Sequence, residues 1–430
     1  MKMRHFVVAL AAMLMVAGTL FANGQSETTA KKSKQLGILF QNSNIPDDTI
    51  VQGYAQSWAK EKNVNLNFQT VDESQLKSKT VAAIESKSGP DLIVFPDYTA
   101  FLYHNDLMNM DNLVGGLAQQ YGGWFPVAKQ AFYFNGHWKA IPYKTFSKPI
   151  VYRKDLLKKV GAEVPQSWQD LAKVSKEISD QVPGVYGFGV AIAPRSDGPN
   201  FIRALLWAFG GSVQDQNGKV DLDSPQSIAA FTFLKNWYKS GGMAPGVAGW
   251  NDSTNNTAFL AGKIAMTYNA SSIYLSAEQQ FPDALVKTTG QAMVPEGPKG
   301  RFGQESAQGL AIPSYSKNSQ TALDFLKYMY TPDRLKHITS ATDAGAIMML
   351  NDPIKSLPLW DNPDIGVLLK IAKASYLTGY PGKMTRGAAA VRSQYVLVNS
   401  AAAMISQDLS PEQAIKSATK KIKAIYAQNQ

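Results

Sequence analysis

Two groups of hydrogen-bonding side chains directly follow short apolar runs. Gln41, Asn42 and Ser43 come after residues 36–40, and Asp97 and Tyr98 come after residues 92–95. We expect both runs to be strands of one parallel sheet, because a helical pattern and a further strand pattern separate them. Ligands bind beyond the carboxyl ends of strands in such sheets. These two loops are therefore predicted to present amide, hydroxyl and carboxylate groups to a ligand.

A third candidate is an aromatic residue, Trp250, which lies among polar neighbours in the irregular segment 241–256. An aromatic side chain on a loop is typical of a ligand platform, because a large apolar surface is costly to expose without use. A phosphate-binding loop is not predicted: Gly187 and Gly189 begin a dinucleotide-like pattern, but Ile192 stands where its third glycine belongs.

The stretch 135–178 must connect elements that position these groups. It reads as a turn, an extended run with two prolines, and two helices. We expect Asp155 to cap the first helix, Gly161 to end it, and Ser167 with Asp170 to form a capping box on the second. An extended proline-containing segment that leads into new helices predicts a passage between two lobes.

The chain has 430 residues, which exceeds the size at which single cores usually stop growing. With 45% hydrophobic and 18% charged residues, two globular domains are expected. Two further stretches rich in proline, glycine or irregular sequence, 292–303 and 345–358, are candidate passages between them.

The N-terminus predicts secretion. Residues 1–22 have the short basic start, apolar run and small final residue of a cleavable signal peptide, and residues 23–35 have the polar composition of a flexible leader. Cysteine is absent, which excludes disulfides, thiolate metal sites and a lipid-modified N-terminal cysteine. We therefore expect a periplasmic protein without a lipid anchor.

The formal net charge is +10, but the basic clusters at 31–34 and 416–423 do not alternate with aromatic residues. Such clusters are typical of a solvated tail and a solvated helix face. Nucleic acid is not an expected partner.

The chain resembles the extracellular solute-binding proteins of ABC importers, of the carbohydrate type that includes the maltodextrin and glycerol-phosphate receptors. The resemblance rests on six segments, among them GPDLIVFPD from residue 89, FLAGKIAMTYNASS from residue 259 and the block WKAIPYKTFSKPIVYRKDLLKK from residue 138. It implies an α/β, two-lobed periplasmic-binding-protein fold of type II, in which each lobe is a sheet flanked by helices and three crossings join the lobes. The implied lobes are 36–147 with 306–348, and 148–305 with 349–430. The implied crossings lie near 145–149, 303–309 and 345–353.

The resemblance also implies a set of ligand-binding residues at the interlobe cleft. They are Gln41, Asn42, Ser43, Asp97, Tyr98, Thr145, Phe146, Asn200, Trp250, Asn269, Ser272, Gln308, Tyr380, Arg386 and Tyr395. Amides and carboxylates suit sugar hydroxyls, and aromatic rings suit the apolar face of a sugar. Ser272 stands where maltodextrin receptors place a stacking tryptophan, with Tyr274 two residues on, so a smaller glycan or polyol fits at least as well as a long maltodextrin.

The expected function is the binding of a mono- or short oligosaccharide by a monomer that delivers it to a membrane permease, without a cofactor or metal. A receptor for another solute, namely a phosphorylated polyol, a polyamine or iron, is the alternative. An enzyme is not expected, because His104, His137 and His337 form no HExxH motif and no GxSxG motif occurs.

Overall fold

The structure is a computed structural model that describes residues 34–42, 45–194, 197–280, 286–304 and 306–429. The predicted signal peptide and nearly all of the predicted leader lie outside the described residues, as does Ser43. In the described chain no helix combines the length and the apolar character needed to cross a bilayer.

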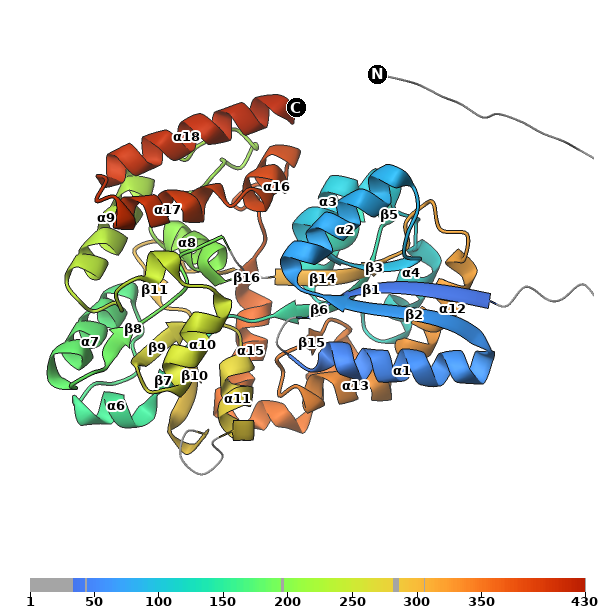
Figure 1. Ribbon diagram of the computed structural model, residues 1–430, viewed down its shortest axis with the longest axis horizontal. Helices are drawn as coiled ribbons and strands as arrows, with labels where there is room; N and C mark the ends of the chain where they lie inside the picture. The colour runs from blue at the N-terminus through green and yellow to red at the C-terminus, as the bar shows by residue number, and fades with distance from the viewer. Residues whose placement is uncertain (1–33, 43–44, 195–196, 281–285, 305, 430) are drawn as a thin grey trace, which may run out of the picture. The chain divides into compact units, whose positions relative to one another are not determined.

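The first lobe is built on a six-stranded sheet in the order β15-β6-β14-β3-β1-β2 (Figure 1). β1 pairs in parallel with β2 and β3, as the strand and helix patterns predict, whereas β14 runs antiparallel to β3 and β6, and β15 runs antiparallel to β6. The strands are β1 (Lys34–Gln41), β2 (Val64–Val71), β3 (Leu92–Pro96), β6 (Ile141–Phe146), β14 (Ser306–Ala311) and β15 (Ile347–Met348). The carboxyl ends of β1, β3 and β6 and the start of β14 consequently lie at the same end of the sheet.

Helices pack on this sheet and share one hydrophobic core with it. The core is continuous because the strands are apolar on both faces, as Leu92, Ile93, Val94 and Phe95 of β3 show by their complete burial. The helices are α1 (Asp47–Lys62), α2 (Glu73–Ser86), α3 (Asp97–Tyr103), α4 (Asp111–Gln120), α5 (Pro126–Phe132), α12 (Ser319–Met329), α13 (Pro332–Ala341), α14 (Asn351–Lys355) and α15 (Pro363–Ala374).

The second lobe has a four-stranded sheet in the order β10-β7-β9-β8 and its own core. Its strands are β7 (Ile150–Arg153), β8 (Tyr186–Phe188), β9 (Ile264–Tyr268) and β10 (Thr289–Ala292). Its helices are α6 (Lys154–Lys159), α7 (Trp168–Gln181), α8 (Asp197–Ala208), α9 (Pro225–Lys239), α10 (Asp252–Leu260), α11 (Ser272–Gln280), α16 (Arg386–Ser393), α17 (Val396–Ser406) and α18 (Pro411–Gln428).

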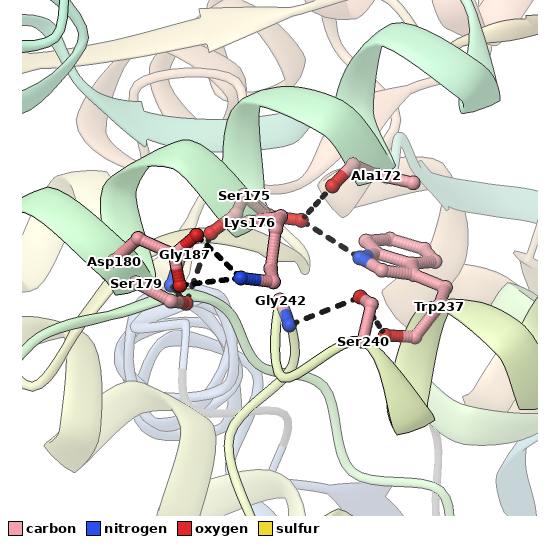
Figure 2. Close-up of polar contacts among 9 residues, drawn as sticks. All are labelled: Ala172, Ser175, Lys176, Ser179, Asp180, Gly187, Trp237, Ser240 and Gly242. Carbon is pink, nitrogen blue, oxygen red and sulfur yellow. Dashed lines mark hydrogen bonds and ion pairs between the residues drawn. The ribbon is translucent and has the colours of Figure 1, made fainter.

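A polar network fixes α7 to its neighbours in this lobe (Figure 2). The indole Nε1 of Trp237 on α9 donates to Ser175 Oγ at 2.7 Å, and Ser179 Oγ accepts the backbone N–H of Gly187 at 2.9 Å. A Cβ at Gly187 would lie 1.9 Å from the carbonyl oxygen of Ser175. Gly187 is therefore a packing glycine that lets β8 approach α7.

The helix boundaries around 154–181 bear out two of the three end signals. Ser167 and Asp170 form the predicted capping box on α7, and Gly161 follows α6 with a φ of +66°. The expectation for Asp155 was wrong: it lies in the first turn of α6 and accepts from Arg153 Nε at 2.8 Å and from Nη2 at 2.6 Å. The adjacent guanidinium offers this carboxylate a stronger partner than a backbone amide would.

The buried residues pass from the first core to the second between Phe146 and Ile150, and back between Phe302 and Ala307. Leu275 of α11 is an exception, because it packs in the first core. The third passage differs from the expectation of 345–353, because buried residues from 350 to 377 remain in the first core and the second core resumes at Ala390.

Helix α15 explains this difference, because it contacts both lobes. Its apolar face, which includes Leu368, packs in the first core. Asp364 at its start accepts from Lys154 Nζ at 2.6 Å and from the backbone N–H of Gln291 at 3.3 Å, both in the second lobe. The carbonyl oxygen of Leu368 accepts from Ser147 Oγ, in the first passage, at 2.7 Å.

Candidate functional site

A cavity of about 610 Å³ is lined by residues of both lobes. The first-lobe residues are Gln41, Asn42, Ile45, Thr70, Val71, Asp72, Glu73, Ser74, Gln75, Pro96, Tyr98, Phe146, Ser306 and Gln308. Lys148, in the first passage, also lines it, and the second-lobe residues are Pro194, Asp197, Asn251, Ser253, Asn256, Asn269, Ala270, Ser272, Arg392 and Tyr395. The cavity has the size typical of a small-molecule site.

Strands that meet at this end of the sheet supply amides to the first-lobe wall of the cavity. Gln41 ends β1, and Gln308 lies on β14 opposite Pro96 of β3. Gln308 Nε2 donates to Gln41 Oε1 at 2.7 Å, while Gln308 Oε1 is buried and has no hydrogen-bond partner among the described residues. Since a buried amide oxygen normally accepts a hydrogen bond, this pair is poised to receive one from a ligand or a water.

The second-lobe wall repeats this chemistry. Asn251 caps α10 through its side chain, which accepts from the backbone N–H of Thr254 at 3.0 Å. Asn269, directly after β9, donates from Nδ2 to Asn256 Oδ1 at 2.6 Å. Amides thus face the cavity from both lobes, and each amide can both donate and accept.

The charges of Lys148 and Asp197 offset each other. Lys148 Nζ donates to Asp197 Oδ1 at 2.5 Å, and Asn255 Nδ2 donates to Asp197 Oδ2 at 3.0 Å. The Lys148 and Asp197 side chains are only 5% and 4% exposed. This part of the wall therefore presents a neutral hydrogen-bonding surface to a ligand.

Aromatic rings and one guanidinium form another part of the wall. Tyr98 OH and Tyr395 OH both donate to Glu73 Oε1, at 3.5 and 3.3 Å. The guanidinium of Arg392 lies 5.1 Å from the ring centroid of Tyr98 and 5.7 Å from that of Tyr395. Burial, followed by the Glu73 charge, raises the pKa of Tyr98, so this hydroxyl is protonated at neutral pH.

Asp97, at the start of α3, is buried and is not among the residues that line the cavity. Burial raises its pKa to about 6, and the nearby charges of Arg392 and Arg203 oppose that rise. Asp97 Oδ2 and Asn200 Nδ2 have no hydrogen-bond partner among the described residues, whereas Asn200 Oδ1 accepts from Arg203 Nη2 at 3.0 Å. These side chains form a buried polar layer behind the cavity.

The predicted site residues thus fall into two groups. Those that line the cavity are Gln41, Asn42, Tyr98, Phe146, Asn269, Ser272, Gln308 and Tyr395. The described residues that do not are Asp97, Thr145, Asn200, Trp250, Tyr380 and Arg386.

Packing accounts for the position of several residues in the second group. Thr145 is fully buried within β6, and Trp250 is packed so close to Gly189 that a Cβ there would lie 2.7 Å from its Cζ3. Tyr380 packs against Tyr376 at a centroid distance of 4.3 Å, and Arg386 is exposed at the start of α16.

The predicted set of site residues did not include several lining residues, among them Glu73, Arg392 and the ion pair of Lys148 and Asp197. The two partners of the ion pair are 49 positions apart in the chain, and nothing in either local pattern indicates the other. Glu73 had a local signal, because it lies shortly after an alternating run at residues 64–68, as Asp97 lies shortly after the apolar run at residues 92–95.

The described residues contain no group of three or more histidine, cysteine, aspartate or glutamate side chains placed to hold a metal ion. The residues that line the cavity offer amide, hydroxyl and charged groups for hydrogen bonding.

The chain is similar in sequence to known binding proteins. The chain is 26% identical over 224 residues to a Deinococcus radiodurans protein named "Probable ABC transporter-binding protein". The aligned residues are 48% of this chain, which spans about half the length (50%) of that relative. The chain is 24% identical over 363 residues to the maltotriose-binding protein of Pyrococcus abyssi, covering 81% of this chain and 74% of that protein.

Among solved structures, maltose-bound MalE3 of T. maritima superposes with a TM-score of 0.80, at 21% identity over 91% of this chain and 100% of that one. This likeness confirms the predicted two-lobed α/β fold. The family model of the bacterial extracellular solute-binding proteins matches residues 42–334. This match covers more than half of the sequence, and the chain therefore belongs to the bacterial extracellular solute-binding protein family.

Proposed function

We propose that this protein is the monomeric, periplasmic receptor of an ABC importer, and that it binds a neutral sugar in the cavity and delivers it to a membrane permease. One observation carries the proposal: amides and hydroxyls from both lobes line the cavity, and the Lys148 and Asp197 charges in its wall are paired with each other. The lobe boundaries near 147 and 305 are part of the same proposal.

The chemistry of the wall fits a sugar. Each sugar hydroxyl both donates and accepts, so it needs groups such as Gln41, Gln308 and Asn269, which do the same. Tyr98, Phe146 and Tyr395 add ring surface for the apolar face of a sugar. The relative from Pyrococcus abyssi and the structure from T. maritima are described with maltotriose and maltose, which are also neutral sugars.

The alternative solutes fit less well. Ferric iron prefers phenolate ligands, yet burial and Glu73 raise the pKa of Tyr98. A polyamine needs available carboxylates, but Asp197 is bonded by Lys148 and Asn255, and Glu73 accepts from two tyrosines. The third carboxylate of the wall, Asp72, accepts from Ser74 Oγ and from the backbone N–H of Gln75. A phosphorylated polyol needs cations; of the two in the wall, Lys148 is paired with Asp197, and the Arg392 guanidinium lies against the rings of Tyr98 and Tyr395.

A thermal-shift screen of the chain from residue 23 onward tests the proposal. The panel holds neutral mono-, di- and trisaccharides, polyols, polyol phosphates, spermidine and ferric citrate. A ligand at 100 times its dissociation constant stabilises the folded state by about 2.7 kcal/mol, which gives a measurable rise in Tm. We expect a rise with at least one neutral sugar. A rise with iron, spermidine or a polyol phosphate alone would replace the sugar assignment.

A further inference from the structure

Four side chains in the cavity wall connect the two lobes directly. Glu73 and Tyr98 belong to the first lobe, and Arg392 and Tyr395 belong to the second; we call these four residues the interlobe cluster. Glu73 Oε1 accepts hydrogen bonds from the hydroxyls of both tyrosines, at 3.5 Å within its own lobe and at 3.3 Å across the cleft. These bonds form between protein groups alone and need no ligand.

Arg392 extends the connection. Its side chain is 6% exposed and its guanidinium lies near the rings of both tyrosines, one from each lobe. A buried guanidinium that contacts aromatic rings gains from the cation–π interaction more than an exposed one does. Beside the cluster, Lys77 Nζ on α2 donates to the carbonyl oxygen of Ser393 at 2.9 Å, and α3 packs against α16.

The backbone at Tyr395 is a second, independent observation. Its φ of +57° and ψ of +29° are left-handed, a conformation that a bulky residue rarely adopts. The residue links α16 to α17, and this turn brings its hydroxyl to Glu73. Strained conformations of this kind persist where the surrounding structure holds them and are concentrated at functional sites.

We infer that the interlobe cluster stabilises the approach of the two lobes in the absence of ligand, so that Glu73, Tyr98, Arg392 and Tyr395 act as positioning residues. The inference rests on the proposed receptor function. Apparent affinity equals intrinsic affinity scaled by the fraction of molecules in the binding-competent arrangement. The cluster would therefore set the affinity for solute by raising that fraction.

The test compares ligand-free proteins, so it does not depend on which solute binds. Tyr395→Phe and Tyr98→Phe each remove one hydroxyl and keep the ring, and Tyr186→Phe, at an exposed tyrosine on β8, is the matched control. Small-angle X-ray scattering gives the radius of gyration of each. Because the chain has no cysteine, spin labels on Glu61→Cys of α1 and Lys173→Cys of α7, both exposed, report the distance between lobes.

We expect Tyr395→Phe, and more strongly the Tyr98→Phe/Tyr395→Phe double variant, to raise the ligand-free radius of gyration and shift the label distances, with Tyr186→Phe unchanged. For any sugar that the thermal screen identifies, the dissociation constant should rise by about three- to tenfold in Tyr395→Phe.

Unchanged ligand-free dimensions in both cluster variants would overturn the inference. A weaker affinity with unchanged ligand-free dimensions would assign Tyr395 to direct ligand contact instead. If no sugar binds but the ligand-free dimensions still respond, the proposed solute class fails while the interlobe cluster stands.

Discussion

Gln308 is the residue through which three strands meet at the cavity, since it lies on β14, opposite Pro96 of β3, and donates to Gln41 of β1. Its buried Oε1, which has no hydrogen-bond partner in the described part of the chain, places an acceptor beside a donor that is already in use. A sugar hydroxyl that donates to this oxygen would satisfy it.

Replacing Gln308 by alanine should therefore weaken sugar binding by about 1.5 kcal/mol, or roughly tenfold, because a hydroxyl of the ligand loses its partner in a buried site. Isothermal titration calorimetry with the sugar found by the thermal screen measures this change. Gln320→Ala, at an exposed position on α12, is the control and should leave the affinity unchanged. Equal affinities for the two variants would remove Gln308 from the site.

Asp97 gives a pH-dependent prediction. Its pKa in the folded protein is about 6, above the ordinary value of 3.8. Between pH 3.8 and about pH 6, the folded state therefore keeps a proton on Asp97 that the unfolded state has released. The corresponding stability is full below about pH 4 and is lost as the pH rises through about 6. The shift corresponds to on the order of 3 kcal/mol.

The unfolding free energy of the native protein should thus fall, relative to that of Asp97→Asn, between pH 4 and pH 7. Urea denaturation at several pH values measures the difference. Asp106→Asn, an exposed aspartate in the same lobe, should show no such trend against the native protein. Parallel pH profiles for native protein and Asp97→Asn would contradict the raised pKa.

At the scale of single residues, sequence reasoning located side chains that follow strands but could not establish which of them face the cavity. Gln41 and Asn42 line it, whereas Asp97, in the equivalent position after β3, is buried beside Arg203 and Arg392. Those arginines are more than 100 positions away along the chain. Only tertiary packing brings them to α3.

Among the elements, β6 and the passage after it connect the lobes through buried charge. Lys144 Nζ and Tyr143 OH both donate to Asp47 Oδ2, at 2.6 and 2.7 Å, and the Lys144 and Asp47 side chains are fully buried. Asp47 is the first residue of α1. Lys148, four residues after Lys144, pairs with Asp197 of α8. The passage is thus bound to α1 in the first lobe and to α8 in the second.

Lys144→Met should destabilise the protein by about 3 to 5 kcal/mol, because it leaves the Asp47 carboxylate buried without its ammonium partner. Urea denaturation followed by circular dichroism measures this loss. The double variant Lys144→Met/Asp47→Asn removes both charges of the pair and should recover part of the stability. A single variant as stable as the native protein would show that the pair contributes little.

The local signals for elements were reliable where one short pattern determines the outcome, as in the capping box of Ser167 and Asp170 and the left-handed exit at Gly161. They failed at Asp155, where the neighbouring Arg153 competes for the carboxylate. The sequence did not show why Gly187 and Gly189 are glycines. In the structure, a Cβ would meet the Ser175 carbonyl at Gly187 and the Trp250 ring at Gly189.

For the whole molecule, chain length predicted two domains, and the resemblance to solute-binding proteins implied two α/β lobes, which the fold comparison confirms. The third passage could not be located from sequence because α15 has an apolar face in the first core and contacts the second lobe through Asp364. Because α15 is one continuous helix that contacts both lobes, its sequence pattern does not mark where one lobe ends and the other begins. The amide-lined cavity likewise exists only when residues from both ends of the chain are brought together.

The central claim is that a neutral sugar occupies this cavity and draws its two walls together, as ligands do when they shift an equilibrium between two arrangements. Small-angle X-ray scattering of the purified protein, titrated with each neutral sugar of the panel, tests it most directly. We predict a saturable decrease in the radius of gyration with at least one mono- to trisaccharide. No change with any neutral sugar, together with a decrease on adding ferric citrate, spermidine or a polyol phosphate, would contradict it.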